Sequence, residues 1–391
     1  MDAYIVSGYR TAVGRAKKGG FRFTRPDDLA IDVIKHMVSS VEGLENGMVD
    51  DVIVGNAVQE AEQGMQMGRM ISLMALGIDV PGMVINRYCG SGLEAINIAS
   101  AKIHAGLADC IIAGGTESMS MVPVMGWKTA LNYKIASAHP DYYTSMGLTA
   151  EQVAKEYNVS REDMDQFAYE SHMKAIKAQQ DGKFDDEIVP IKVEEIFVNA
   201  KGKKESKEYT VAKDEGPRPE TSVDVLSRLR PVFAQGGSVT AGNSSPTNDG
   251  AAFVVVMSER LVNQLNLKPV GRMMGYAAAG VEPRIMGIGP VAAIPKALDR
   301  AGMKLGDMDL IELNEAFAAQ SLAVIKELDI DTSKLNVNGG AIALGHPLGS
   351  TGARLSITLL NEMRRQNAKY GMVTACVGGG QGVAGIYEFL N

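Results

Sequence analysis

The stretch DVIVGN at residues 51–56 follows an amphipathic helical pattern at 29–40, and it recurs later in the chain. Its counterpart, DLIELN at 309–314, follows a similar helical pattern at 291–301. Both copies read as helix, loop, Asp, apolar strand and Asn. A pattern that returns in this order predicts an internal structural repeat.

The segments after each copy also correspond. In the first copy, the sequence predicts a strand and glycine turn at 84–89, a helix at 93–105 and a strand at 110–113. In the second copy, the counterpart of the strand and turn begins at 335–341, followed by a helix at 351–364 and a strand at 372–376. Continuous apolar strands that alternate with helices favour a parallel-rich sheet covered on both faces. Two such halves that face each other predict an α/β fold with five layers, α/β/α/β/α.

The middle of the chain differs in composition, being richer in Met, charged and turn residues. It predicts a helix at 149–157 and a second helix that begins after the cap Ser160 and runs to about residue 180. A solvated hairpin is predicted at 201–213. A strand at 252–257 marks the return to the first half. We therefore expect an N-terminal half at 1–120 plus 247–268, an inserted loop domain at 121–246 and a C-terminal half at 269–391.

The totals exclude several classes of function. The 391 residues include 39 basic and 46 acidic side chains, for a net charge of −7, which argues against nucleic acid or an anionic membrane as a partner. No apolar run approaches the roughly 20 residues of a membrane span. The three cysteines form no metal-binding pattern with the histidines, so we expect no metal. Sparse cysteines favour a reducing compartment, and we expect a cytoplasmic protein.

The segment NRYCGSG at 86–92 places Cys89 in a glycine turn directly before a helix. A thiol exposed at a helix N-terminus is expected to have a lowered pKa and to act as a nucleophile. A buried structural cysteine is the alternative.

Three further segments hold reactive side chains. His346 lies between Gly and Pro in GGAIALGHPLG at 339–349, where it is either a base for a thiol or a polar surface residue. Cys376 ends a strand in TACVGGGQG at 374–382, as a second reactive thiol or as core packing. Asn314 begins NEAFA at 314–318, as an oxygen ligand or as a helix cap. Two thiols, a histidine and an amide suit carbon–carbon bond chemistry through an acyl-enzyme.

These four segments, in this order, resemble the motif blocks of the thiolase family over the whole chain. The resemblance implies that Cys89 becomes acylated and that His346 activates it or the thiol of coenzyme A (CoA). It implies that Cys376 is the acid/base, and that Asn314 holds a water that forms one oxyanion hole with His346. The backbone amides of Cys89 and Gly378 would form the other hole.

The resemblance also implies that CoA and acyl-CoA are substrates, with no covalently bound cofactor. The inserted loop domain would bind CoA, with Arg218 near the nucleotide end and Met146 at the acyl pocket. The residues expected beside the pantetheine are Phe233, Ala241, Ser245, Ala316 and Phe317. The turn VTAGNSSP at 239–246 is, on its own residues, either a phosphate or amide contact or a plain turn.

Ser145 stands where short-chain, acetoacetyl-forming thiolases usually carry His, so the resemblance favours a degradative 3-ketoacyl-CoA thiolase of fatty-acid β-oxidation. The alternatives are a biosynthetic acetyl-CoA acetyltransferase and, in another class, a non-catalytic acyl-binding subunit. A ketoacyl synthase is disfavoured because it uses two histidines, and a dinucleotide-binding oxidoreductase because a proper GxGxxG is missing. The resemblance further implies a homodimer or homotetramer, with a hydratase–dehydrogenase subunit as a possible partner.

Overall fold

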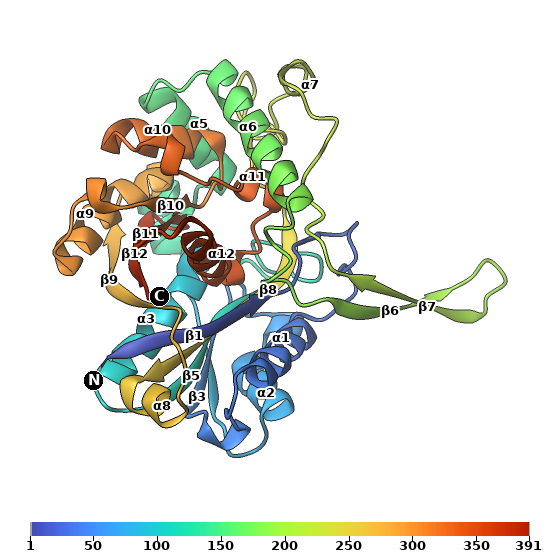
Figure 1. Ribbon diagram of the computed structural model, residues 1–391. Helices are drawn as coiled ribbons and strands as arrows, with labels where there is room; N and C mark the ends of the chain where they lie inside the picture. The colour runs from blue at the N-terminus through green and yellow to red at the C-terminus, as the bar shows by residue number, and fades with distance from the viewer. Residues whose placement is uncertain (1, 391) are drawn as a thin grey trace.

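The computed structural model describes residues 2–390. It contains a large mixed sheet, a separate two-stranded ribbon, and helices on both faces of the sheet (Figure 1). The N-terminal half comprises β1 (Ala3–Arg10), β2 (Gly14–Arg15), α1 (Pro26–Ser40), β3 (Asp51–Gly55), α2 (Met67–Ala75), β4 (Gly82–Ile85), α3 (Ser91–His104) and β5 (Cys110–Ser118), and later β8 (Asn248–Ser258) and α8 (Glu259–Gln264). The C-terminal half comprises β9 (Gly271–Gly280), α9 (Gly289–Ala301), β10 (Leu310–Leu313), α10 (Ala318–Leu328), α11 (Ala341–Leu344), α12 (Thr351–Gln366), β11 (Tyr370–Val377) and β12 (Gln381–Phe389).

The sheet runs in the order β10-β11-β12-β9-β1-β8-β5-β3-β4, with β2 paired to β8. The two halves of the sheet meet where Ile5 of β1 pairs with Gly271 of β9. The expectation of a parallel-rich sheet is wrong. Only β3–β4, β3–β5 and β10–β11 pair in parallel, because the returning strand β8 and the tight β11–β12 turn both add antiparallel neighbours.

The five expected layers are confirmed by the way side chains alternate along the strands. In β8, Phe253 and Val255 pack in a core with α1 and α2, whereas Val254 and Val256 pack in a second core with α3 and α12. A third core joins β12 to α9 on the opposite side. The order of layers is therefore α1/α2, sheet, α3/α12, sheet, α9/α10, as period-two burial on both faces requires.

Local sequence explains where the helices that cover the sheet begin and end. Pro26 occupies the first turn of α1, and Asp27 and Asp28 follow there, where they favour the positive end of the helix dipole. α9 ends at Gly302, whose φ of 67° is the left-handed conformation that terminates helices. The predicted helices at 29–40 and 291–301 are thus confirmed, with slightly earlier starts.

The predicted counterpart at 335–341 departs from the repeat. Only Leu335 forms a bridge, to Ile311, and the chain then turns into α11. The amide side chain of Asn336 takes the place of a strand. Its Oδ1 accepts from the backbone N–H of Leu313 and its Nδ2 donates to the Leu313 carbonyl, both at 2.9 Å.

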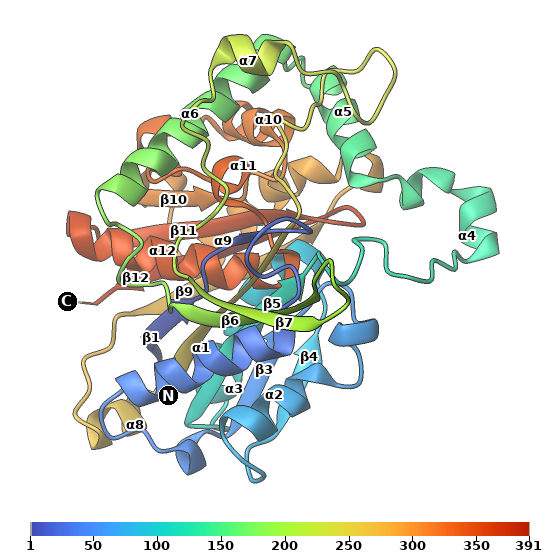
Figure 2. The ribbon, with the colours of Figure 1, turned by 90° about the vertical axis from the view of Figure 1, so that its right-hand side faces the viewer.

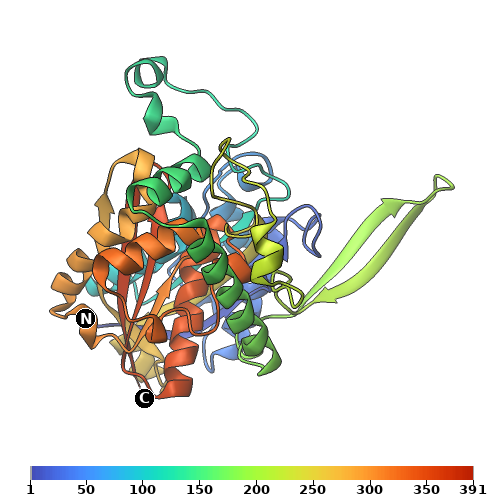
Figure 3. The same cartoon turned by 90° about the horizontal axis from the view of Figure 1, so that it is seen from above.

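The middle segment forms α4 (Tyr133–Ala138), α5 (Met146–Glu156), α6 (Arg161–Gln180), β6 (Ile191–Val198), β7 (Lys204–Val211) and α7 (Val223–Ser227). α5 and α6 pack against α10, while α4 lies on an arm that extends away from the body (Figure 2). The ribbon β6–β7 projects from the body in a different direction from the α4 arm (Figure 3), so the predicted hairpin is confirmed and begins earlier. Ser160 caps α6 as expected.

Candidate active site

Cys89 lies in a short turn, Tyr88–Gly90, directly before α3. Tyr88 has a φ of 41°, an unusual conformation for a residue with a side chain, and such strain is typical of functional turns. The thiol accepts hydrogen bonds from the backbone amides of Cys89 and Gly378. The turn therefore brings the expected nucleophile to the expected oxyanion amides.

The expectation of an exposed thiol with a lowered pKa is wrong. Cys89 is only 1% exposed, and burial raises its pKa to about 12, although the two backbone amides act in the opposite direction. Glu117 nearby raises it further. A buried thiol before a helix is therefore held as S–H in the free protein.

Cys376 lies near the end of β11, fully buried. Burial raises the pKa of its thiol, and so does the neighbouring Cys89. The effect of Cys89 on the pKa of Cys376 indicates that the two thiols lie near each other. Cys376 also belongs to an apolar cluster with Ala316 and Phe317, against which Met146 packs.

His346 is buried, and its ring makes two contacts that define its protonation. Nδ1 lies 2.6 Å from Thr351 Oγ1, and that hydroxyl already donates to the Pro347 carbonyl at 2.9 Å, so it accepts from Nδ1–H. Nε2 is then the unprotonated nitrogen, and it accepts from Asn314 Nδ2 at 3.2 Å. Burial, followed by the charge of Arg354, lowers the His346 pKa to about 3, so the ring is a neutral base.

Two buried polar residues, neither of them predicted, hold the loop around His346. Asn248 Oδ1 accepts from the His346 backbone N–H at 2.9 Å, and Glu117 accepts from the Gly349 N–H at 2.8 Å. Leu348 of this loop packs directly against Cys89. Thr351 was also missed, although it begins the predicted helix at 351–364. The GGTES segment at 114–118, equivalent in the repeat to the Cys376 segment, is the signal that points to Glu117.

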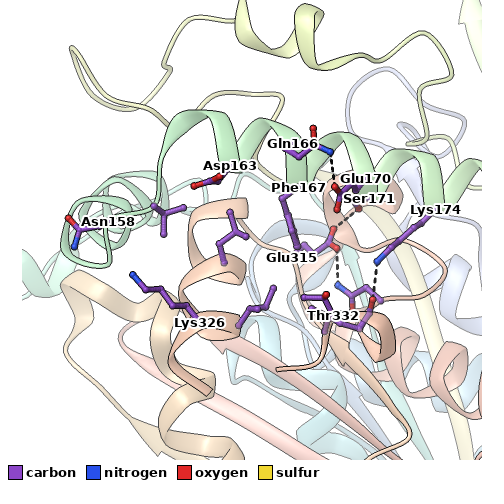
Figure 4. Close-up of a pocket in the computed structure, with 15 residues that line it drawn as sticks. Asn158, Asp163, Gln166, Phe167, Glu170, Ser171, Lys174, Glu315, Lys326 and Thr332 are labelled. Carbon is purple, nitrogen blue, oxygen red and sulfur yellow. Dashed lines mark hydrogen bonds between the residues drawn. The ribbon is translucent and has the colours of Figure 1, made fainter. Parts of the chain in front are cut away.

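Glu315 follows Asn314 in the chain, and its carboxylate also holds the loop that carries His346. Its carboxylate accepts from Ser171 Oγ at 2.6 Å and from Asn336 Nδ2 at 2.8 Å (Figure 4). The carboxylate accepts from the Ile342 N–H as well, at 3.2 Å. It also forms part of the wall of a pocket of about 490 Å³ between α6 and α10. Because all three bonds fix neighbouring segments, Glu315 ties Asn314 to the loop that carries His346.

The expected CoA-binding residues fall into two places. Ser245 N–H donates to the Ala316 carbonyl at 2.9 Å, and the ring of Phe233 lies edge-on to Phe317 with a centroid distance of 6.0 Å. This group lies near Cys376. Ala241 is exposed at the adjoining turn. Arg218 instead lies at α6, where its backbone N–H donates to His172 Nδ1 at 3.3 Å.

A second pocket, of about 510 Å³, adjoins the turn that carries Cys89. Its lining includes Tyr88, Leu348 and Gly378, together with Ser145 and Met146. Within residues 2–390, no group of His, Cys, Asp and Glu has the arrangement of a metal site, and no helix is both long and apolar enough to cross a bilayer.

Comparison with known proteins decides the family. The family descriptions "Thiolase, N-terminal domain" and "Thiolase, C-terminal domain" match residues 3–260 and 267–389. This chain belongs to the thiolase family. It is 53% identical over 388 residues to a protein named 3-ketoacyl-CoA thiolase from Bacillus subtilis, covering 99% of both chains. It is 45% identical to an acetyl-CoA acetyltransferase from Pseudomonas aeruginosa over 98% of both chains.

The solved structures agree. The crystal structure of the Bacillus anthracis acetyl-CoA acetyltransferase superimposes with a TM-score of 0.89 and 40% identity, covering 100% of this chain and 99% of that one. The thiolase is therefore an enzyme of an acyltransferase family, and it holds two buried thiols and a buried neutral histidine, side chains that suit that class of chemistry.

Thr351 gives the first test of the site of this thiolase. Thr351→Val removes the acceptor that fixes Nδ1–H, so the inactive tautomer of His346 becomes populated. We expect kcat/KM to fall about tenfold at every pH between about 6 and 9, and Thr351→Ser to restore it. Thr358→Val is the matched control, because this hydroxyl of α12 donates to Glu187 instead. Equal losses in the Val and Ser variants would contradict the tautomer role.

Proposed function

We propose that this thiolase cleaves 3-ketoacyl-CoA with CoA, giving acetyl-CoA and a shortened acyl-CoA, as in fatty-acid β-oxidation. The observation that carries the proposal is the pairing of Cys89 with Cys376 beside the amides of Cys89 and Gly378. One thiol takes the acyl group and the other moves a proton, so one site serves both half-reactions.

In the first half-reaction, His346 Nε2 takes the proton of Cys89, and the sulfur attacks the 3-keto carbon. The bond between C2 and C3 breaks, Cys376 donates its proton to C2, and acetyl-CoA leaves. The acyl chain stays on Cys89 as a thioester. In the second half-reaction the thiol of CoA gives its proton to the Cys376 thiolate and attacks the thioester carbon. The bond between that carbon and the Cys89 sulfur breaks, the shortened acyl-CoA leaves, and His346 returns its proton to Cys89.

The pKa values of Cys89 and His346 support a proton transfer that takes place as the Cys89 sulfur attacks the substrate. With the Cys89 pKa near 12 and the His346 pKa near 3, the resting pair is neutral. Charge therefore appears only as the reaction proceeds, where the amides of Cys89 and Gly378 stabilise one oxyanion. Asn314 Oδ1 is buried without a hydrogen-bond partner, which suits the water that would complete the other oxyanion hole with His346.

We further propose that the segment 121–246 is the loop domain that binds CoA. Met146 and Phe233 come from this segment and adjoin Phe317 and Cys376. A pantetheine arm laid along this group would reach the thiols. Arg218, beside α6, would meet the nucleotide end of the same ligand.

The pocket beside Ser145 supports acyl chains longer than acetoacetyl. A serine in this wall leaves space that an imidazole would fill. We expect 3-ketohexanoyl-CoA and longer substrates to be cleaved at rates comparable to acetoacetyl-CoA, and Ser145→His to slow the longer substrates about tenfold. Gln59→His, at the exposed rim of the same pocket, is the control. Confinement of the wild type to four-carbon substrates in a chain-length series of kcat/KM would contradict this proposal.

The same series tests the biosynthetic alternative, which condenses two acetyl-CoA molecules. That alternative is supported by the relatives named acetyl-CoA acetyltransferase. A strict four-carbon preference would favour it.

For assembly we propose a homodimer or homotetramer in the cytoplasm. Large apolar side chains are exposed on two segments of the surface: Met65, Met74 and Ile78 around α2, and Trp127 and Tyr133 on the α4 arm. A hydratase–dehydrogenase subunit stays a predicted further partner. Light scattering of the purified chain tests the oligomer directly.

A further inference from the structure

Two arginines from distant parts of the sequence meet beside the active-site loop. Arg15 ends β2, and its Nη2 donates to the Gly216 carbonyl at 3.3 Å, two residues before Arg218. Glu215 locks the contact, because its carboxylate accepts from the backbone N–H groups of Arg15 and Gly20, each at 2.8 Å. The loop after β2 and the segment before Arg218 therefore form one fixed unit.

The carboxylates in this unit are occupied elsewhere. Asp214 accepts from Arg10 at 2.7 and 2.9 Å and from the Val13 N–H at 2.8 Å, and Glu215 binds the two backbone amides. Across residues 2–390, neither Arg15 nor Arg218 takes part in an ion pair. Arg15 and Arg218 therefore lie near each other, and neither guanidinium group binds a carboxylate of the described residues.

His172 confirms how close the two positive charges lie. It is buried in α6, and burial, then Arg218 and Arg15, lower its pKa to about 4, so it stays neutral and accepts from the Arg218 N–H. Burial lowers the pKa of Arg218 as well, and the charge of Arg15 adds to that effect. Arg15 is partly buried and Arg218 is exposed, so an anion from solvent can reach both, and it would offset the free energy of holding two like charges near each other.

The pair is coupled to the catalytic loop. Arg15 lies opposite Asn248 in the β2–β8 ladder, and Asn248 holds the backbone of His346. Gly216 approaches the same loop so closely that a Cβ there would lie 2.0 Å from the Ala343 carbonyl oxygen. An anion held by the arginines would therefore belong to a ligand that also reaches the active site.

We propose that Arg15 and Arg218 form a phosphate subsite that binds the 3′-phosphate of CoA. The proposal rests on the proposed function, because CoA is the phosphorylated substrate. A terminal phosphate monoester carries nearly two negative charges near pH 7, which matches two guanidinium forks, whereas each pyrophosphate phosphorus carries one. The resemblance to the family placed only Arg218 near the nucleotide end of CoA, and the proposal adds Arg15 to it.

The test compares CoA with 3′-dephospho-CoA, by calorimetric binding and by KM in thiolysis. We expect the wild type to bind CoA at least about tenfold more tightly, the lower end of the effect of one charge-assisted hydrogen bond. Arg15→Met should weaken CoA binding about tenfold and change the Kd for dephospho-CoA less than twofold. Arg218→Met, a second variant, should show the same selective loss.

Arg22→Met is the matched control. Arg22 lies on the same loop but pairs with Glu195, so its loss should leave the preference for CoA unchanged. Equal weakening of both ligands in Arg15→Met would overturn the proposal and assign the pair to the pyrophosphate that both ligands share. A wild-type preference below twofold would overturn it as well. Calorimetry reads binding without turnover, so failure of the subsite is distinguishable from failure of the thiolase reaction.

Discussion

Cys89→Ala is expected to lower thiolysis of 3-ketoacyl-CoA by at least about 10³-fold, because no other residue in the site can hold the acyl group. The neighbouring amide of Gly378 stays in place, since it is positioned by the backbone and not by the sulfur. Binding of CoA should therefore persist in the variant. Steady-state kinetics and calorimetry on the same preparation measure the two effects separately.

Cys110→Ala is the control for this variant. Cys110 is also fully buried, and burial raises its pKa to about 12, but it lies in β5 within the core shared with α1. We expect its loss to affect stability and to leave turnover near the wild-type value. Comparable loss of turnover in both variants would show that the effect at Cys89 is structural.

Cys376→Ala is expected to separate acylation from carbon-acid chemistry. Cys89 and His346 remain, so acetyl-CoA should still acylate Cys89, within about tenfold of the wild-type rate. Proton transfer at C2 should fall about 10²- to 10⁴-fold, the usual contribution of a positioned acid or base. Deuterium exchange at C2 of acetyl-CoA, followed by NMR, measures this step directly.

Retained exchange in Cys376→Ala would contradict the role of the second thiol and would move it to His346. Loss of both exchange and acylation would show instead that Cys376 supports the position of Cys89. Cys376→Ser provides a further check, because a hydroxyl of similar size fills the space while its higher intrinsic pKa makes it a weaker proton donor to C2.

Much of the fold could be predicted because the repeat is recorded in local patterns. The segments 51–56 and 309–314 became equivalent strands β3 and β10, and the helices predicted at 93–105 and 351–364 appeared close to their predicted bounds as α3 and α12. The direction of strand pairing could not be predicted. β8 returns from an excursion of more than a hundred residues, and nothing in its apolar pattern tells which neighbour it joins or which way it runs.

The active site, like the fold, could be predicted only in part. The sequence brought Cys89, Asn314, His346 and Cys376 together through their motifs, but it gave Cys89 the wrong environment. Helix position alone suggests a lowered pKa, whereas the buried packing against Leu348 decides the outcome. Such packing depends on contacts between distant segments, which periodicity does not encode.

Supporting residues were missed for a related reason. Asn248, Glu117 and Thr351 hold His346 and its loop through hydrogen bonds, and of the three only Glu117 lies in a segment, GGTES at 114–118, that signals a role. The side chain of Asn336, which replaces a strand at the edge of β10, is equally invisible in the sequence. These bonds become apparent only when the backbone is in place.

The central claim is that Cys89 carries the acyl group. Peptide mass spectrometry after brief incubation with acetyl-CoA and acid quenching tests it most directly. The account predicts one added acetyl group on the peptide that contains Cys89, removed when CoA is added before quenching. A folded protein with no acetyl group on Cys89, or with the label on Cys376 alone, would contradict it and favour a non-catalytic acyl-binding protein or a different nucleophile.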